Sequence, residues 1–445
     1  MDTICAIATP AGNGAISIIR ISGQESIKIV NKIFRGCNLE KVSSHTIHYG
    51  HIVDDNEVID EVLISVMKAP KTFTREDVVE INCHGGSYVT ERVLKLLLEN
   101  GAVLAGRGEF TKRAFLNGRI DLTKAEAVMD MITADSNSSL RLANNGLSGR
   151  LKKCIDEFRE DILELIANIE VNIDYPEYDD AIVITNKILI PKLEELIKKM
   201  ESLLKTASTG KLLKDGILTA IVGRPNVGKS SLLNLLLDED KAIVTDVEGT
   251  TRDIVEGSIN LSGITLKLID TAGIRKTDNY IEALGIDKAK SVIEKADLVI
   301  LVLDSSQKLT QNDLDLLELT KNKQRIIVMN KIDLEKKAFI NEEVISISAK
   351  NGMGLSLLED KIVHLLKLNE NKKDETILSN IRHIVKLEEA RNSLNMALSS
   401  CLEGQDVDLV EIDIKDAWSA LGEITGDTSS ESLINELFSK FCLGK

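Results

Sequence analysis

The stretch Gly223-Arg-Pro-Asn-Val-Gly-Lys-Ser230 decides the fold of the central part of this chain. It matches the pattern G-x-x-x-x-G-K-S and stands between the apolar run Ile217–Val222 and the helix-like segment Ser231–Leu237. Glycines let the backbone N–H groups of such a loop turn inward around phosphate oxygens. In this pattern Lys229 reaches the β- and γ-phosphates, and the Ser230 hydroxyl ligates Mg²⁺. The loop therefore predicts a site for a nucleoside triphosphate.

Apolar runs without polar alternation surround this loop, which is typical of strands buried on both faces of a parallel sheet. Helical segments lie between the runs, as in a doubly wound α/β domain. The runs are Ile217–Val222, Thr265–Ile269, Leu298–Leu303, Arg325–Met329 and Glu343–Ile347. We therefore expect a P-loop domain over residues 215–368.

Three further motifs follow predicted strands and indicate a guanine nucleotide. In Asp270-Thr-Ala-Gly273 the carboxylate can hold Mg²⁺ through water, and the Gly273 N–H can contact the γ-phosphate. In Asn330-Lys-Ile-Asp333 the carboxylate can accept two hydrogen bonds from guanine, a pair of donors that adenine does not offer. Ser348-Ala-Lys350 can place a backbone N–H on the guanine oxygen. Together these motifs predict GTP rather than ATP.

The residues that perform hydrolysis are less evident. The polar loop Gly249-Thr-Thr-Arg-Asp253 is typical of a switch segment in which Thr251 completes the Mg²⁺ shell. Many small GTPases orient the attacking water with a glutamine after D-x-x-G, but this chain has Ile274 there. Either hydrolysis is very slow or another group acts. The candidates are Asp278 and Glu282 as carboxylates, and Arg252 and Arg275 as sources of positive charge.

The sequence on either side of the P-loop domain has a different pattern. Residues 1–118 contain short β-branched runs and one helical segment, which predicts a mixed α and β domain. Residues 119–214 and 369–445 contain long amphipathic stretches, with Thr123 and Glu126 as a predicted capping box. We expect one discontinuous helical domain into which the P-loop domain is inserted. Two separate helical modules are the alternative.

Composition excludes several classes of protein. The 445 residues carry a net charge of −15, which argues against a free-standing nucleic-acid binder with a basic surface. Aromatic residues make up only 3%, too few for a broad base-stacking platform. The six cysteines form no C-x-x-C pair, so reduced thiols are expected. With no basic leader segment and no apolar run near the roughly 20 residues of a membrane span, we expect a cytoplasmic protein that does not enter a membrane.

Short motifs outside the P-loop domain carry a resemblance that runs over essentially the whole chain. They are Asp2-Thr-Ile4, Ala8-Thr-Pro10, Arg20-Ile-Ser-Gly23, Phe73-Thr74, Glu80, His84-Gly-Gly86, Gly108-Glu-Phe110, Ala114-Phe-Leu-Asn-Gly118, Asp121-Leu122 and Phe441-Cys-Leu-Gly-Lys445. With the GTP motifs, they resemble the MnmE (TrmE) family of bacterial tRNA-modifying GTPases. The resemblance implies an N-terminal α+β tetrahydrofolate-binding domain, a helical domain, and an inserted, doubly wound, Ras-like P-loop GTPase domain.

The resemblance also implies roles in the GTPase domain. Glu282 would orient the attacking water, which accounts for Ile274. K⁺ would bind at Asn226, Thr245, Val247 and Thr250, where it takes the electrostatic part of an arginine finger, and Mg²⁺ would bind at Ser230 and Thr251. The positions expected to contact GTP are Asn226, Val227, Gly228, Lys229, Ser230, Ser231, Thr245, Asp246, Val247, Glu248, Gly249, Thr250, Thr251, Asp270, Thr271, Ala272, Gly273, Asn330, Lys331, Asp333, Ser348, Ala349 and Lys350.

The first 118 residues resemble a tetrahydrofolate-binding domain that forms a constitutive homodimer. Arg20, Glu80, Arg119 and Lys445 match the folate site of the family. A carboxylate can accept the N–H groups of a pterin, and Arg or Lys can bind the glutamate tail. The implied cofactor is 5-formyl- or 5,10-methylene-tetrahydrofolate. The resemblance places Cys442 in the tail that enters the folate pocket, where it would take part in one-carbon transfer or protect it; inert packing is the alternative.

The implied function is GTP hydrolysis coupled to modification of tRNA. A flavin-dependent partner of the MnmG (GidA) type, expected to hold FAD and NADH, would form a heterotetramer with the dimer. Together they would add a carboxymethylaminomethyl or aminomethyl group at C5 of the wobble uridine, U34. K⁺-dependent dimerisation of the GTPase domains would drive hydrolysis. The alternative is a regulatory or ribosome-assembly GTPase without modification chemistry, which would need neither the N-terminal block nor the Cys442 tail.

Overall fold

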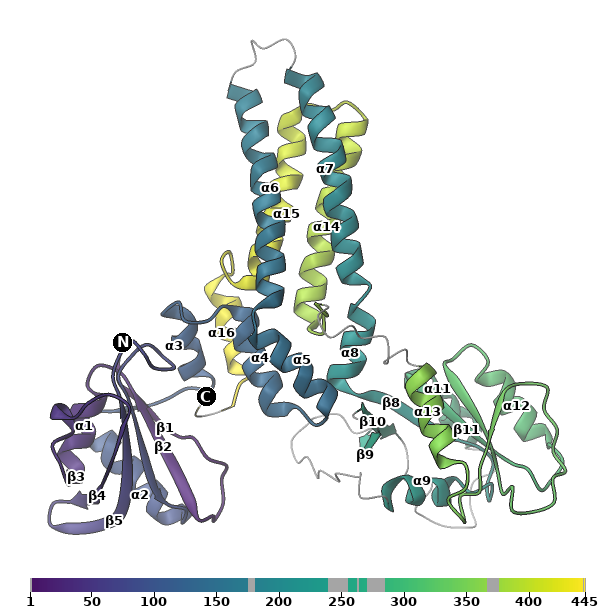
Figure 1. Ribbon diagram of the computed structural model, residues 1–445, viewed down its shortest axis with the longest axis horizontal. Coiled ribbons are helices and arrows are strands. Elements are labelled where there is room, and N and C mark those ends of the chain that lie inside the picture. The colour runs from purple at the N-terminus through teal and green to yellow at the C-terminus, as the bar shows by residue number, and fades with distance from the viewer. Residues whose placement is uncertain are drawn as a thin grey trace. The chain divides into compact units, whose positions relative to one another are not determined.

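The computed structural model describes residues 2–174, 181–238, 255–261, 264–269, 285–365, 376–442 and 444. The chain divides into two compact units. The first consists of Met1–Met129, Leu147–Leu189 and Met396–Lys445, and the second of Asp130–Gly146 and Ile190–Asn395. Each unit contains one β-sheet, with the N-terminal strands in purple and the central strands in teal and green (Figure 1).

The elements follow one another in an order that changes from mixed to helical to alternating and back to helical. The strands are β1 (Ile4–Ile7), β2 (Ile16–Ser22), β3 (Phe34–Arg35), β4 (Thr46–Asp54), β5 (Glu57–Met67), β6 (Val78–His84), β7 (Val103–Leu104), β8 (Ile217–Val222), β9 (Val255–Leu261), β10 (Ile264–Ile269), β11 (Leu298–Asp304), β12 (Arg325–Asn330) and β13 (Val344–Ser346). The helices are α1 (Ser26–Ile33), α2 (Ser87–Glu99), α3 (Glu109–Leu116), α4 (Leu122–Thr133), α5 (Asn137–Leu147), α6 (Arg150–Asp174), α7 (Ala181–Leu204), α8 (Ala207–Asp215), α9 (Lys229–Asp238), α11 (Gly285–Lys295), α12 (Gln311–Leu319), α13 (Leu355–Leu365), α14 (Ile381–Leu402), α15 (Val407–Thr425) and α16 (Glu431–Ser439).

The N-terminal sheet has the strand order β3-β4-β5-β6-β2-β1-β7. Its central strands are antiparallel, and β1 pairs with β7 in parallel. Alternate side chains of β2 and β6, such as Ile19 and Ile81, are fully buried against α1 and α2, whose Val30 and Leu97 are also buried. The opposite face of the sheet carries Arg20 and Glu80. The prediction of a mixed α and β N-terminal segment is confirmed.

The central sheet has the order β13-β12-β11-β8-β10-β9. All its pairs are parallel except β10 with β9. Every residue of β11 is buried, as expected for a strand that is covered on both faces. The five predicted strands of this domain are confirmed, with ends that differ by at most one residue. The antiparallel strand β9 was not predicted.

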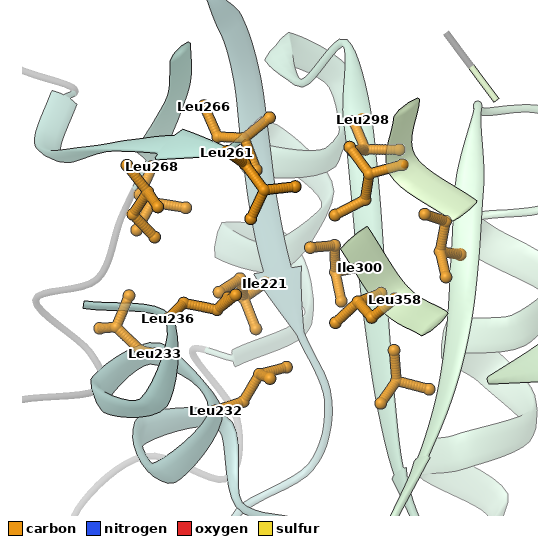
Figure 2. Close-up of a cluster of buried hydrophobic side chains, with 14 of the residues drawn as sticks. Ile221, Leu232, Leu233, Leu236, Leu261, Leu266, Leu268, Leu298, Ile300 and Leu358 are labelled. Carbon is orange, nitrogen blue, oxygen red and sulfur yellow. The ribbon is translucent and has the colours of Figure 1, made fainter. Parts of the chain in front are cut away.

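One face of the central sheet packs against the helix that follows the P-loop. Leu232, Leu233 and Leu236 of α9 are buried, and they lie opposite Ile221, Leu266 and Leu268 of β8 and β10 (Figure 2). Burial of a leucine side chain stabilises a fold by about 1.5–3 kcal/mol. This core therefore holds α9, and with it the loop at its N-terminus, firmly on the sheet.

The helical segments differ from the prediction at the start of α4, and one hydrogen bond joins two segments that are far apart in the sequence. The expected N-cap at Thr123 is wrong: α4 begins at Leu122, and the Asp121 carboxylate accepts a hydrogen bond of 3.1 Å from the Lys124 N–H. The helix therefore begins two residues earlier than predicted, and Leu122, its first residue, is fully buried. Farther along, the Leu378 N–H donates to the Thr206 hydroxyl at 3.0 Å. The chain segments before and after residues 217–365 are thus in contact. Among the described helices, none is both long and apolar enough to cross a membrane.

Candidate functional site

The P-loop leaves the end of β8 and turns into α9 at Lys229. Gly228 adopts φ +98°, and a Cβ there would lie under 3.0 Å from the side-chain amide of Asn330. Asn226 has φ +63°, a left-handed conformation that asparagine tolerates better than most residues. The glycine is therefore required for the loop to approach the guanine motif, and the loop backbone is held in an unusual conformation.

The P-loop lysine lies across the loop that precedes it. Its ammonium donates hydrogen bonds of 2.8 Å to both the Gly223 and the Arg224 carbonyls. Burial lowers the pKa of Lys229. These contacts hold the charged group at the start of α9, where the helix dipole also favours an anion.

Asn330 joins the three predicted nucleotide motifs that the structure describes. Its Nδ2 donates to the Val227 carbonyl at 2.8 Å, and its Oδ1 accepts from the Ala349 N–H at 2.9 Å. The residue is 2% exposed, so both hydrogen bonds are protected from water. The P-loop, the segment that ends β12, and the segment after β13 are therefore fastened together by one amide side chain.

Two charged residues of the guanine motif have opposite orientations. The Ser348 hydroxyl donates to Asp333 Oδ1 at 2.7 Å, and this hydrogen bond lowers the pKa of Asp333. The Lys331 ammonium points back to the P-loop, where it donates to the Asn226 carbonyl at 2.8 Å. Asp333 is thus an ionised acceptor suited to guanine, while Lys331 supports the loop.

Asp304 belongs to this site and was not predicted. It is the last residue of β11, is 4% exposed, and accepts a hydrogen bond of 2.7 Å from the Lys331 ammonium. Burial acts to raise the pKa of Asp304, but hydrogen bonds from Lys331 and Ser306 outweigh it, so the pKa is lowered. A carboxylate directly after six apolar residues is the sequence signal that could have identified it.

A second group of predicted residues meets in the N-terminal sheet. Arg20 of β2 is opposite Glu80 of β6, and its Nε lies 2.8 Å from Glu80 Oε1. The Arg20 Nη1 also donates to the Gly444 carbonyl at 3.2 Å. Next to this contact, the Gly108 N–H donates to the Cys442 carbonyl at 3.2 Å. Gly444 therefore lies beside the Arg20–Glu80 pair, and Cys442 lies beside Gly108.

Comparison with known proteins shows similarity over the whole chain. Residues 3–119 match the family model "GTP-binding protein TrmE N-terminus", and residues 122–442 match "MnmE helical domain". The tRNA modification GTPase MnmE of Ligilactobacillus salivarius is 53% identical over 455 residues, covering 100% of this chain and 98% of that protein. The protein of the same description from Streptococcus thermophilus is 54% identical over 449 residues, with the same coverage.

The chain belongs to the MnmE (TrmE) family. This membership confirms the predicted family, the fold class, and the prediction of a GTP-hydrolysing enzyme. Solved structures with similarity to part of the chain include the G domain of the Thermotoga maritima FeoB iron transporter, at 32% identity. That match covers 34% of this chain and 98% of the other, with a TM-score of 0.26. Aquifex aeolicus Era bound to GDP·AlF4⁻ is 28% identical, with coverage of 40% and 66% and a TM-score of 0.26.

Arg119, the remaining described residue of the implied folate site, contacts a separate loop of this MnmE-family chain. Its Nη1 donates to the Thr72 carbonyl at 2.7 Å, and its guanidinium lies 5.1 Å from the centre of the Phe73 ring. Arg20 has a similar aromatic neighbour, since its guanidinium is 5.8 Å from the centre of the Phe110 ring. Both cations therefore lie against apolar ring faces that limit their motion.

Several predicted residues lie outside the described part of the chain. In the GTPase domain they are Thr245, Asp246, Val247, Glu248, Gly249, Thr250, Thr251, Arg252, Asp270, Thr271, Ala272, Gly273, Ile274, Arg275, Asp278 and Glu282; at the C-terminus the residue is Lys445. The described members of the predicted GTP set are Asn226, Val227, Gly228, Lys229, Ser230, Ser231, Asn330, Lys331, Asp333, Ser348, Ala349 and Lys350. The first six belong to the P-loop and the start of α9, Asn330 is the last residue of β12, and the others follow β12 and β13.

Proposed function

We propose that this member of the MnmE family binds GTP at the P-loop and hydrolyses it as one step in tRNA wobble-uridine modification. The hydrogen bonds of Asn330 to Val227 and Ala349 carry the proposal. They bring the phosphate-binding loop and the base-binding motifs into one preorganised site. Asp333, ionised and fixed by Ser348, then selects guanine by accepting two hydrogen bonds from its edge.

Hydrolysis in this proposal depends on residues around the γ-phosphate. Lys229 neutralises charge that develops on the phosphates, and Ser230 and Thr251 would hold Mg²⁺, which would supply further positive charge there. Glu282 orients the attacking water, and Asn226, Thr245, Val247 and Thr250 would hold K⁺, which would supply the positive charge of an arginine finger. The positioned Asn226, whose carbonyl accepts from Lys331, supports this assignment at its one described residue. Dimerisation of the GTPase domains with K⁺ completes the site.

The Arg20–Glu80 pair is proposed as the tetrahydrofolate site. A half-buried carboxylate suits the N–H groups of a pterin, and guanidinium groups suit the glutamate tail. Arg20 remains anchored by Glu80 at 2.8 Å and by the Gly444 carbonyl at 3.2 Å. Arg119 and Lys445 complete the set. Cys442, whose side chain is exposed, lies two residues before Gly444, which contacts Arg20, and we assign it a part in one-carbon transfer.

The domain division supports this assignment of roles. We propose a folate-binding and dimerisation domain over 1–118, a helical domain over 119–214 and 369–445, and an inserted GTPase domain over 215–368. The contact between Leu378 and Thr206 supports the insertion, because the chain enters and leaves the GTPase domain at adjacent points. The second partner is a flavin protein of the MnmG type, which supplies FAD and NADH chemistry in a cytoplasmic heterotetramer.

The decisive experiment is nucleoside analysis of tRNA from a strain that lacks the gene. Wobble uridines should lose the carboxymethylaminomethyl or aminomethyl group at C5, and the intact gene should restore it. A Lys229→Ala gene should fail to restore it, because GTP no longer binds. If the wobble uridines stay fully modified in the deletion strain, the chain is instead a regulatory or ribosome-assembly GTPase.

A further inference from the structure

The P-loop contains one charged side chain that no nucleotide motif requires. Arg224, the second residue of the loop, directs its guanidinium away from the loop toward the segment between β11 and α12. Its Nη2 donates to Gln307 Oε1 at 2.8 Å, and its Nε lies 3.3 Å from Asp313 Oδ2. The Arg224 and Asp313 side chains are 18% and 2% exposed, so this ion pair is largely protected from water, whereas the hydrogen bond to Gln307 is exposed.

Asp313, the partner of Arg224, also accepts hydrogen bonds at the start of α12. Its Oδ2 accepts hydrogen bonds from the N–H and the hydroxyl of Thr310, at 2.9 and 2.8 Å. The Asp313 side chain is only 2% exposed, and its Oδ1 has no hydrogen-bond partner among the described residues. A buried carboxylate in this condition is strongly destabilised unless a cation stays beside it. Arg224 supplies that cation.

The same segment also supports the guanine motif. Asp304, where the segment begins, lies 2.7 Å from the Lys331 ammonium, and Lys331 in turn donates to the Asn226 carbonyl at 2.8 Å. Residues 304–313 therefore contact the P-loop at two points: through Asp304 and Lys331 at Asn226, and through Asp313 at Arg224. The left-handed conformation of Asn226, with φ +63°, is held next to these two anchors.

We propose that Arg224 is a positioning residue for nucleotide binding, which acts by tying the P-loop to Asp313 and Gln307 of the 304–313 segment. The proposal rests on the proposed function of the P-loop as the GTP site. Without the tie, the loop must be ordered when the nucleotide binds, and that ordering subtracts from the affinity. Once GTP is bound, phosphate contacts hold the loop, so the chemical step should be affected little.

Arg224→Ala in the full-length protein tests this. We expect the Kd for fluorescent GDP and the KM for GTP to rise about tenfold, the equivalent of 1.4 kcal/mol, while kcat at saturating GTP changes less than twofold. Gln307→Ala removes one tie from an exposed position without risk to the fold, and should raise Kd about threefold. Arg325→Ala is the matched control, since Arg325 bridges Thr320 at the far end of α12 to Glu342; its Kd should equal that of the wild type.

A double-mutant cycle with Asp313→Asn distinguishes positioning from general loss of structure. If the tie carries the effect, Arg224→Ala combined with Asp313→Asn should raise Kd no more than Arg224→Ala alone. Effects that multiply would overturn the proposal, and so would a Kd for Arg224→Ala within twofold of the wild type. If the wild type itself fails to bind guanine nucleotides, the proposed function fails, and this inference fails with it.

Discussion

Replacement of Gly444 by alanine tests whether the C-terminal tail belongs to the proposed folate site. Gly444 has φ +83°, and a Cβ at this position would lie under 3.0 Å from the Ile7 carbonyl. The left-handed conformation alone costs a residue with a Cβ about 1–2 kcal/mol. Ile7 cannot move away readily, because it is paired with Ile19 in the sheet. The tail should therefore leave its site, and Arg20 should lose its contact with the Gly444 carbonyl.

The size of the effect follows from the backbone term. A cost of about 1–2 kcal/mol is a factor of about 5–30 in an equilibrium constant, and the steric clash adds to it. Calorimetric titration with 5-formyl-tetrahydrofolate should thus show a Kd raised at least about fivefold, while GTP turnover stays unchanged.

Gly404→Ala provides the matched control for this variant. Gly404 has φ +71°, and a Cβ added there would meet no heavy atom within 4 Å, so the change carries the backbone cost without the clash. Its folate affinity should equal that of the wild type. Unchanged folate affinity in Gly444→Ala would refute the reasoning, because the tail would then make no contribution to the site.

Three further predictions address other parts of the molecule. Asp333→Asn should lower GTP affinity by about a hundredfold or more and favour xanthosine triphosphate, whose edge matches an amide; competition binding would expose a variant that still prefers GTP. Replacing Na⁺ by K⁺ should raise GTP turnover strongly in the wild type but not in Glu282→Ala, and equal rates in both salts would remove K⁺ from the mechanism. Phe438→Ala should destabilise the first unit by about 3–5 kcal/mol, because Phe438 is 1% exposed and its ring centre lies 5.0 Å from that of Phe441. Urea unfolding would measure the loss, and folate binding should weaken while GTP binding persists.

The GTPase sheet was predictable because its strands are buried on both faces. Such strands are continuous apolar runs, and burial of all seven residues of β11 is the extreme case. Strand β9 has a different sequence pattern and lies at the edge of the sheet. Polar residues alternate with the other residues along Val255-Glu-Gly-Ser-Ile-Asn-Leu261. Its conformation depends on pairing with β10, with Leu261 opposite Ile264. Tertiary pairing of this kind leaves little trace in a single sequence.

The two candidate sites also differ in how far they can be predicted from the sequence. The P-loop and guanine motifs are local patterns whose chemistry can be derived from residue types alone. Arg20 and Glu80 are 60 positions apart, and the register of β2 and β6 makes them neighbours. The family resemblance assigned both residues to one site, but it did not predict their ion pair. Arg224 stands at a position that the G-x-x-x-x-G-K-S pattern leaves unspecified. Its partner Asp313 lies in a helix outside that pattern. Contacts that depend on the packing of distant elements were therefore the ones that sequence reasoning missed.

The acidic segment 403–436, which includes α15, restricts how the proposed complex can hold tRNA. Residues 403–436 contain ten carboxylates and a single lysine. That lysine, Lys415, already lies 2.9 Å from Glu411 and 3.2 Å from Glu170. Burial raises the pKa of Asp413, and the negative charge of Asp416 acts in the same direction. The carboxylates of this segment would also repel a phosphate backbone. Under the proposed function, the basic surface that binds tRNA must therefore come from another face of this chain or from the flavin partner.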